Sequence, residues 1–346
     1  MRHILPARFD TENDLVDFLA APGPKDVEAA AASDGPLVIL GAGGKMGPTL
    51  AVRAARARAA AGCKEPVFAV SRYSDQATHD WITAAGVRTI VAELTDPQTY
   101  PQLPDAPDVI FMAARKFGTG ADAALTWTTN AFIPGLAADR YRDSRIVAFS
   151  TGNVYPLVPV GSGGATEETP LNPVGEYAWS ALARERVFQS FSLRFGTPIL
   201  ILRLNYAVEL RYGVLTDLAQ RIVSGTPIDL AMGAVNVIWQ GDANSICLRS
   251  FALASSPPAV LNLTGPGSLS VRWLAEELGK RLNIEPHFLG TERDNALLND
   301  ATRALNRFGP LQVDVESVLD WVADWVLRWG ATFDKPTHFE VRDGQF

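Results

Sequence analysis

Six short runs of apolar residues follow one another between residues 36 and 203, and stretches with a helical spacing of apolar positions separate them. Because these runs are apolar nearly throughout, rather than at alternate positions, each predicts a strand that is buried on both faces of a sheet. Buried strands that alternate with helices predict an α/β fold with a doubly wound parallel sheet of the Rossmann type. The six runs are residues 37–40, 67–70, 89–92, 109–112, 145–149 and 198–202.

The segment before the first run predicts a helical extension. Thr11 precedes Glu12 and Asp14, which is the pattern of an N-cap followed by acidic residues in a first helical turn. Residues 22–24, Pro-Gly-Pro, end that helix, and the alanine-rich residues 27–33 predict a second one. We expect this extension to pack against the main domain or against a partner subunit.

The pattern loosens after the sixth run. Residues 235–239 and 260–263 predict two further strands, and residues 271–282 predict an amphipathic helix. We interpret this part as a smaller C-terminal substrate cap that is interleaved with the first domain. The predicted division is 1–34 for the N-terminal extension, 35–205 plus about 234–263 for the Rossmann domain, about 206–233 plus 264–330 for the cap, and 331–346 for a C-terminal tail.

Three tryptophans, Trp321, Trp325 and Trp329, lie four residues apart in the last predicted helix, which Gly330 ends. Side chains at this spacing lie along one face of a helix. The stripe therefore predicts a buried core or an interface rather than a platform for a ligand.

Composition and charge narrow the classes of function. The chain has 31 Lys and Arg against 38 Asp and Glu, and this net charge of −7 argues against a nucleic-acid partner. No apolar stretch reaches the length of about 20 residues that a membrane helix needs. With early acidic residues and no targeting pattern, we expect a cytoplasmic protein. The two cysteines, Cys63 and Cys247, and the four histidines are too scattered to predict a disulfide framework or a metal site.

A glycine-rich segment lies directly after the first predicted strand and opens a helix. It reads Gly-Ala-Gly-Gly-Lys-Met-Gly over residues 41–47, with glycines at the GxxGxxG positions Gly41, Gly44 and Gly47. In this context glycine permits a tight turn and lets the backbone approach a pyrophosphate, while the helix N-terminus offers free N–H groups. The segment predicts a dinucleotide site. A plain glycine-rich turn is the alternative interpretation.

The end of the second predicted strand bears on the choice of cofactor. Dinucleotide folds that bind NAD usually place an acidic residue there for the ribose 2′-hydroxyl, whereas this chain has Ser71 and Arg72. A guanidinium attracts a 2′-phosphate, and Lys45 in the glycine turn adds a second cation. We therefore expect NADP(H) to be favoured over NAD(H). The alternative is that both are solvated surface charges.

Several further motifs follow the predicted strands, and only the whole set, rather than any one motif, is specific. They are Ala113-Ala114 after the fourth strand, Asn130 on the next helix, Ser150 to Tyr155 after the fifth strand, and Pro173 to Tyr177. With the glycine turn, they give the chain a resemblance to the extended short-chain dehydrogenase/reductase superfamily of NAD(P)-dependent epimerases, dehydratases and reductases. The resemblance runs from about Pro36 to Trp329.

The resemblance implies which residues form the site. Tyr177 matches the tyrosine that gives or takes a proton, and Thr151 matches the residue that binds the same substrate oxygen while the cofactor carries the hydride. Asn153 and Asn205 are expected to contact substrate. The residues expected to bind the cofactor are Gly41, Gly44, Lys45, Met46, Gly47, Ser71, Arg72, Leu94, Ala113, Ala114, Asn130 and Tyr177.

The chain departs from the family pattern at the YxxxK motif, because Ala181 stands where the lysine is expected. In the family this lysine holds the nicotinamide ribose and lowers the pKa of the tyrosine. A tyrosine hydroxyl with an ordinary pKa of about 10 can donate a proton to a carbonyl, but oxidation of an alcohol needs tyrosinate. Lys116 and Arg184 are possible replacements for the missing cation.

A second departure concerns the substrate. Members that bind nucleotide sugars usually carry an arginine that grips the diphosphate, and the matching position here is Val235, although the nearby Asp242 is retained. A buried diphosphate without a cation is poorly compensated. The resemblance therefore predicts a small sugar, polyol or carbonyl substrate, processed by an oxidoreductase or epimerase. A homodimer is the expected partner arrangement. The alternative is an NADP-binding sensor or interaction protein with reduced catalysis.

Overall fold

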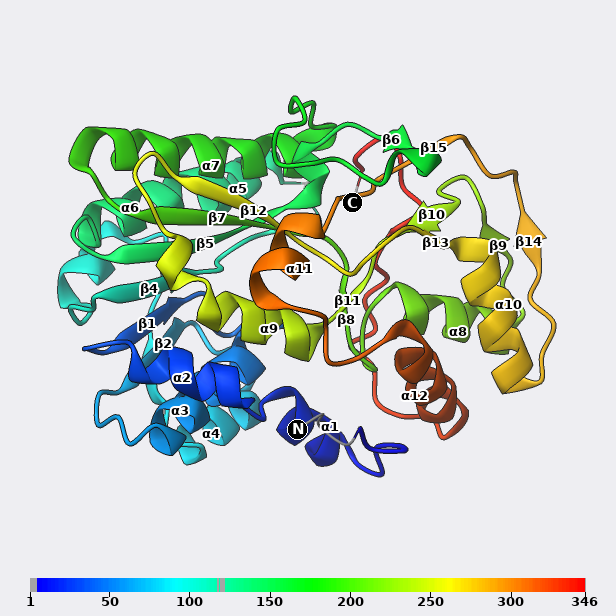
Figure 1. Cartoon of the computed structure of the whole chain (residues 1–346), viewed down its shortest axis with the longest axis horizontal. Helices are drawn as coiled ribbons and strands as arrows, with labels where there is room; N and C mark the ends of the chain where they lie inside the picture. Colours follow the sequence, from blue (N-terminus) through cyan, green and yellow to red (C-terminus); the bar gives the residue numbers. More distant parts are fainter. Residues whose placement is uncertain (1–4, 117, 119–121, 346) are drawn as a thin grey trace.

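The computed structural model describes residues 5–116, 118 and 122–345. Its centre is a seven-stranded parallel sheet with the strand order β12-β7-β5-β4-β1-β2-β3 (Figure 1). This order, with crossovers in both directions from β1, confirms the doubly wound Rossmann-like fold. The strands are β1 (Leu37–Leu40), β2 (Val67–Ser71), β3 (Arg88–Val91), β4 (Asp108–Phe111), β5 (Arg145–Thr151), β7 (Ile199–Leu204) and β12 (Ala259–Leu263).

Helices cover both faces of this sheet, which explains why the strands are apolar nearly throughout. One face carries α3 (Gly47–Ala60), α4 (Gln76–Ala84), α9 (Gln240–Arg249) and α11 (Thr302–Phe308), and the other carries α5 (Ala123–Trp127), α6 (Ile133–Arg140) and α7 (Gly175–Phe195). The π-helical turn η2 (Thr128–Phe132) joins α5 to α6. The short helices are η1 (Pro97–Gln102), η3 (Gly152–Val154), η4 (Val160–Ser162) and η5 (Phe251–Leu253).

The cap is built from α8 (Val214–Ser224), α10 (Val271–Leu282) and α12 (Val315–Leu327), which share one core. The single strand expected at residues 235–239 is wrong. The chain instead breaks at Asn236, whose side-chain amide accepts from Asn299 N and donates to Gly267 O. The short strands are β6 (Val158–Pro159), β8 (Ala207–Val208), β9 (Ile228–Asp229), β10 (Ala234–Val235), β11 (Ile238–Trp239), β13 (Leu269–Ser270), β14 (Phe288–Leu289) and β15 (Asn295–Ala296).

The N-terminal extension forms α1 (Glu12–Leu19) and α2 (Pro24–Ala31) and packs within its own chain. Leu15 is fully buried in the cap core, whereas α2 contacts α3 and α9 of the sheet domain. The buried Asp26 accepts from Arg53 at 2.8 Å and from Ser245 Oγ at 2.5 Å. The extension therefore holds the two parts of the molecule together. Its second helix begins at Pro24, earlier than expected, because proline suits the first turn of a helix.

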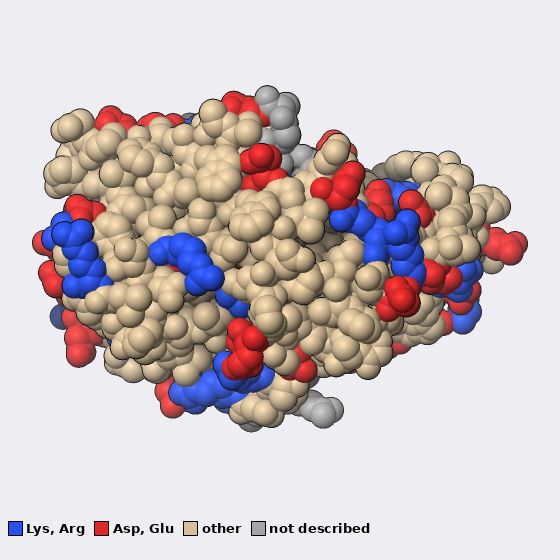
Figure 2. All heavy atoms as spheres, turned by 90° about the horizontal axis from the view of Figure 1, so that it is seen from above, with Lys and Arg blue, Asp and Glu red and all other residues tan. Residues whose placement is uncertain are grey.

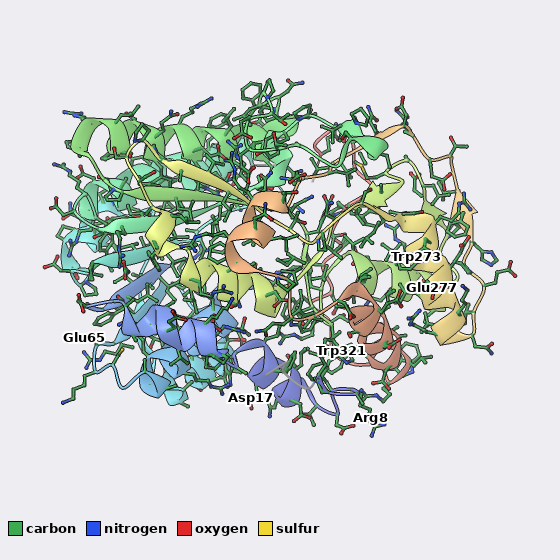
Figure 3. The ribbon with its side chains drawn as sticks, viewed as in Figure 1. Arg8, Asp17, Glu65, Trp273, Glu277 and Trp321 are labelled. Carbon is green, nitrogen blue, oxygen red and sulfur yellow. The ribbon has the colours of Figure 1, made fainter. Side chains whose placement is uncertain are left out.

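The expected tryptophan stripe is only partly present. Trp321 and Trp325 are buried, and Trp321 donates to Pro6 O at 2.8 Å. Figure 3 shows Trp321 on α12, close to the N-terminal segment. Trp329 lies beyond the end of α12, has a positive φ of 57° and is 83% exposed. The chain turns there because Gly330 N donates back to Trp325 O and the Trp325 ring lies against Gly330.

Candidate cofactor and catalytic site

The glycine turn lies where β1 ends and α3 begins. At two of its positions, close contacts with the protein backbone leave no room for a side chain. Gly41 has a φ of 87°, and a Cβ there would lie 2.5 Å from Ala113 N. A Cβ on Gly47 would overlap the backbone of Ala42. At Gly44, by contrast, the nearest atom to a Cβ is Gly41 O at 3.7 Å. No protein atom therefore requires glycine at Gly44, which is a position where a ligand would approach the backbone.

The first turn of α3 has the features of an anion-binding helix start. Its N-cap residue, Met46, makes no side-chain capping bond, and the first turn contains no acidic residue. The N–H groups and the positive end of the helix dipole are therefore available to an anion. Together with Gly44, this turn fits the diphosphate of a dinucleotide.

Ser71 and Arg72 lie at the end of β2, next to the glycine turn, because the Ser71 hydroxyl faces Gly43. The Arg72 side chain is 78% exposed and forms a 3.6 Å ion pair with Glu93. This guanidinium is accessible to a ligand, although a carboxylate already partly neutralises it. Leu94, which follows Glu93, is buried.

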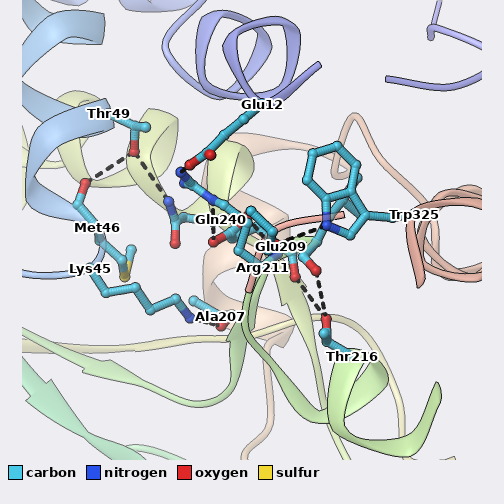
Figure 4. Close-up of polar contacts among 12 residues, drawn as sticks. Glu12, Lys45, Met46, Thr49, Ala207, Glu209, Arg211, Thr216, Gln240 and Trp325 are labelled. Carbon is cyan, nitrogen blue, oxygen red and sulfur yellow. Dashed lines mark hydrogen bonds and ion pairs between the residues drawn. The ribbon is translucent and has the colours of Figure 1, made fainter. Parts of the chain in front are cut away.

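The Lys45 side chain points away from Ser71 and Arg72. Its ammonium donates to Ala207 O at 2.7 Å and lies 3.8 Å from the centre of the Tyr212 ring, on the cap side of the turn (Figure 4). Although the residue is partly exposed, protein surrounds the ammonium, and this burial lowers the pKa of Lys45 to about 7. The structure therefore does not bring Lys45 to Arg72 as a second cation.

Asn130 on η2 organises a buried hydrogen-bond network. Its carbonyl accepts from Arg115 N at 2.9 Å and from Arg184 Nη2 at 2.7 Å. Its amide donates to Ser180 Oγ at 2.9 Å and to Arg115 O at 2.9 Å. Arg184 also donates to Phe149 O at 2.9 Å. Asn130 thus fixes α7 against the segment after β4 and against β5.

Thr151 and Tyr177 both lie at the carboxyl edge of the sheet. Thr151 is the last residue of β5, and its hydroxyl donates to Asn153 Oδ1 at 3.0 Å and accepts from Asn153 N at 3.2 Å. Tyr177 is in the first turn of α7, which packs on β5 and η3. Both residues are buried. The charge of Arg184 on the same helix interacts with Tyr177.

Ala181 occupies a space that has no room for a lysine. It is fully buried in a small apolar cluster with Val154, Tyr155 and Ala165. One turn further along α7, Arg184 is almost fully buried, and its Nε atom has no hydrogen-bond partner among the described residues. Position 181 therefore carries no cation, and the buried cation on the same helix is Arg184.

The two expected substrate contacts have structural partners. Asn205 is 2% exposed, and its amide lies 3.5 Å from both Asn236 Oδ1 and Leu297 O. Asn153, described above, is only partly buried. Val235 is fully buried in the cap core, so this position holds an apolar side chain where the family pattern has an arginine.

A buried ion pair near Thr151 did not emerge as a site from sequence reasoning. Arg203 donates to Glu185 at 3.0 and 2.7 Å and to the Tyr155 hydroxyl at 2.6 Å, and Ser150 Oγ donates to the same carboxylate at 2.5 Å. This network joins α7, β5 and β7 behind the carboxyl edge. The charged Arg203 inside an apolar strand was the available signal, because a buried arginine needs a carboxylate partner.

A cavity of about 140 Å³ lies at the opposite, amino-terminal edge of the sheet. Asp108 in its wall accepts from Ser33 Oγ at 2.6 Å and from Arg145 at 2.8 and 2.9 Å. Its charges therefore stabilise the fold and do not point to a ligand. Across the described residues, no helix is long and apolar enough to cross a membrane, and no three His, Cys, Asp or Glu side chains could together hold a metal ion.

Comparisons with known proteins agree with this geometry. Residues 37–233 match the NAD dependent epimerase/dehydratase family, while no curated protein matches the chain significantly. The structure is similar to UDP-glucose 4-epimerase of Thermotoga maritima with UDP-glucose, at a TM-score of 0.72 and 15% identity over 85% of this chain and 99% of that one. It is also similar to dTDP-glucose 4,6-dehydratase of Bacillus anthracis in complex with NAD (TM-score 0.72, 14% identity, 85% and 97% covered). At these identities the likeness establishes the fold.

Proposed function

Because the chain belongs to the NAD-dependent epimerase/dehydratase family, we propose that it is an NAD(P)-dependent oxidoreductase or epimerase that acts on a small sugar, polyol or carbonyl compound. One observation carries the proposal. The uncapped start of α3 and Tyr177 on α7 lie at the same carboxyl edge of the sheet, which is where ligands bind in doubly wound folds.

In this proposal the nicotinamide of the bound cofactor supplies or accepts the hydride. Gly44 and the first turn of α3 bind its diphosphate. Tyr177 gives a proton to the substrate oxygen or takes one from it, and Thr151 binds the same oxygen. Because the Thr151 hydroxyl now donates to Asn153, substrate binding requires that hydrogen bond to be exchanged.

Arg184 is the proposed replacement for the lysine of the family motif. Its guanidinium is buried on the face of α7 that also carries Tyr177, and the two groups interact electrostatically. Arg184 keeps its charge at all relevant pH values, which a buried lysine does not. Its bonds to Asn130 and Phe149 hold it back from the ribose, so it acts on Tyr177 through charge alone.

The preference for NADP(H) over NAD(H) is also a proposal, and it rests on Ser71 and Arg72. The exposed Arg72 guanidinium is free to turn from Glu93 to a 2′-phosphate, which offers more acceptor oxygens and more charge. Since Lys45 lies on the cap side, this preference depends on one arginine and is correspondingly small.

We further propose a homodimer through the face formed by α5, η2 and α7. This face exposes large apolar side chains, and a broad area without charged side chains covers much of the left half of the view over α7 (Figure 2). Contiguous exposed apolar surface of this kind marks interaction sites. The exposed residues are Leu125, Trp127, Phe132, Val174 and Trp179. Analytical ultracentrifugation of the wild-type chain and of Trp179→Glu, which should be monomeric, tests this.

The second candidate function, an NADP-binding sensor without catalysis, is favoured by one observation. The apolar packing around Ala181 leaves no room for the lysine that assists proton transfer in the family. In that case the chain binds cofactor but turns over no substrate.

Turnover by Tyr177→Phe separates the two functions. The wild-type chain and the variant are assayed with NADP(H) on a panel of sugars, polyols and ketones, while calorimetry measures cofactor affinity. The enzyme proposal expects turnover to fall at least about 100-fold, with a far smaller change in cofactor affinity. Tyr141→Phe, which loses only a hydroxyl bond to Pro104 O at the far edge, is the control. Unchanged turnover would refute the role of Tyr177, and cofactor binding without turnover in the wild-type chain would favour the sensor.

A further inference from the structure

The C-terminal segment, residues 331–345, is anchored to the cap. In Figure 1 this segment (red) runs between the sheet domain and the cap. Thr337 donates from its N and Oγ1 atoms to the Asp217 carboxylate on α8 at 2.7 and 2.5 Å, and Phe339 is buried in the cap core. Lys116 of the sheet domain, whose pKa is lowered by burial to about 8, donates to Thr337 O at 3.4 Å. The segment therefore follows the cap and touches the sheet domain.

Arg342 fixes the part of the segment that leads to Gly344. Its guanidinium donates to Ala231 O and to Asn295 O, each at 2.9 Å, and also to Asn295 Oδ1. These acceptors belong to two different stretches of the cap. Because a planar guanidinium with several bonded donors has little freedom to move, the position of Gly344, two residues later, is set by the cap.

Gly344 contacts the start of α7, backbone against backbone. The two glycines that meet there, Gly344 and Gly175, have positive φ angles of 75° and 81°. A Cβ on Gly344 would lie 2.2 Å from Val174 O, and a Cβ on Gly175 would lie 2.4 Å from Gly344 O. Each position therefore needs glycine both for its backbone conformation and for this close approach.

The contact lies at the base of the helical turn that carries Tyr177. Gly175 is the first residue of α7, and its N-cap residue, Val174, makes no side-chain capping bond. Trp127 on α5 donates to Glu176 at 2.6 Å, while Gly344 packs on Gly175. The first turn of α7 is thus held by neighbours from other parts of the chain and not by a cap of its own.

The rest of α7 has separate attachments to the sheet domain. Ser180 accepts from Asn130 at 2.9 Å, and Glu185 accepts from Arg203 at 3.0 and 2.7 Å. A displacement of Gly344 should therefore move the first turn of the helix, where Tyr177 lies, and leave the later turns in place.

We propose that Gly344 is a positioning residue, through which the C-terminal segment sets the place of the first turn of α7 and of the Tyr177 hydroxyl. The inference rests on the proposed function, in which Tyr177 transfers the proton. It adds that the cap helps to place this group, because Thr337 and Arg342 tie the segment to the cap.

Fluorine NMR of the full chain labelled with 3-fluorotyrosine tests the contact without relying on turnover. The chain has seven tyrosines, and Tyr177→Phe assigns the Tyr177 signal. Gly344→Ala should shift or broaden this signal, because its Cβ forces the segment off Val174 O.

Gly196→Ala is the matched control for backbone strain. Gly196 lies at the other end of α7 and has the same φ of 75° as Gly344. No atom of the described residues lies within 4 Å of a Cβ at Gly196. This variant carries the strain of the left-handed backbone without the clash, so it should leave the Tyr177 signal unchanged.

Turnover gives a second readout. Gly344→Ala should lower kcat at least about tenfold, because a small misplacement of a reacting group is costly, while NADPH affinity changes less than about twofold. In a Tyr177→Phe background the same substitution should have no further effect on the residual turnover, since it acts through the missing hydroxyl.

Arg342→Met loosens the same segment without a clash and should alter the Tyr177 signal in the same way. Its control is Arg293→Met, an exposed arginine in the same part of the cap, which should leave the signal unchanged. If Gly344→Ala does not fold, Arg342→Met decides the outcome.

A Tyr177 signal that is unchanged in Gly344→Ala overturns the proposal. A shift of equal size in Gly196→Ala also overturns it, because backbone strain alone would then explain the effect. The same holds if Gly344→Ala lowers turnover equally with and without the Tyr177 hydroxyl. If the wild-type chain turns over no substrate, the proposed function fails, and the fluorine signal still decides whether the segment positions Tyr177.

Discussion

The glycine turn and the first turns of α7 flank the same edge of the sheet, but different contacts fix them. At Gly41 the backbone of Ala113 leaves no room for any side chain. At Ala181 the side chains of Val154 and Tyr155 fill the space, and a different set of side chains would leave room for a lysine. The first constraint comes from backbone that the sheet itself holds in place, and the second comes from replaceable side chains.

This difference separates the two halves of the proposed site. Gly41 and Gly47 tolerate almost no substitution because backbone atoms lie against them, whereas no protein atom imposes glycine at Gly44. Around Tyr177, charge and packing are distributed over several side chains, and Arg184 can occupy the buried position of a cation while Ala181 replaces the lysine. In the proposed site the cofactor half is thus fixed sterically at Gly41 and Gly47, whereas the catalytic half is adjustable.

Ala181→Lys challenges the second half of this comparison and has the largest expected effect. The lysine would overfill an apolar cluster and bury an ammonium, so we expect the free energy of unfolding to fall by roughly 3–5 kcal/mol. Denaturant titration measures this loss. Ala59→Lys, the same substitution at an exposed position near the end of α3, is the control and should cost less than about 1 kcal/mol. A stable Ala181→Lys with increased turnover would show that the pocket still accepts the family lysine.

Gly41→Ala and Gly44→Ala challenge the first half. Gly41→Ala combines a positive φ with a clash against Ala113, and we expect a loss of about 2–4 kcal/mol in unfolding free energy. Gly44→Ala should change stability by no more than about 0.5 kcal/mol, because the nearest protein atom to the added Cβ, Gly41 O, lies at an ordinary contact distance of 3.7 Å. It should nevertheless weaken cofactor binding about tenfold or more. Normal cofactor affinity in Gly44→Ala would show that the diphosphate does not bind at this turn.

Lys45, in the glycine turn, should make the stability of the protein depend on pH. In the folded protein Lys45 loses its proton at about pH 7, whereas the unfolded chain keeps it up to the ordinary value of 10.5. The unfolded state therefore binds more protons above about pH 7, and stability should rise with pH, by at most about 1.4 kcal/mol per pH unit. Lys45→Met should lose this rise between about pH 7 and pH 8, where Lys116 contributes less. Equal slopes in the variant and the wild-type chain would show that the Lys45 ammonium is solvated.

Arg72→Ala has the smallest expected effect. Because Arg72 is 78% exposed and already paired with Glu93, its loss should weaken NADPH binding by about 1 kcal/mol and leave NADH binding unchanged. Glu93→Gln should strengthen NADPH binding slightly, since it frees the guanidinium. Calorimetry with both cofactors measures these differences, and equal affinity of the wild-type chain for NADPH and NADH would remove the proposed preference.

Features set by short-range patterns were predictable from the sequence. The apolar runs place all seven sheet strands within one or two residues, and the GxxGxxG spacing identifies the turn that Gly41 and Gly47 form. The direction of the Lys45 side chain was not predictable, because it depends on Ala207 and Tyr212, which are far away in the sequence.

Other features needed the tertiary structure. Trp329 fits the helical spacing of the stripe, but the contact between Trp325 and Gly330 ends α12 before it. Residues 331–345 have no helical or strand pattern, so their place against the cap and the sheet domain follows only from their partners, such as Asp217 and Lys116.

A crystal structure of the chain soaked with NADPH tests the central claim most directly, because the claim is that one edge of the sheet holds a sterically fixed cofactor site facing Tyr177. The account predicts density for the diphosphate over Gly44 and the first turn of α3, with the nicotinamide ring facing the Tyr177 hydroxyl and Thr151. Density for the cofactor elsewhere, or a nicotinamide out of hydrogen-bonding reach of a substrate oxygen held by Tyr177, would contradict it.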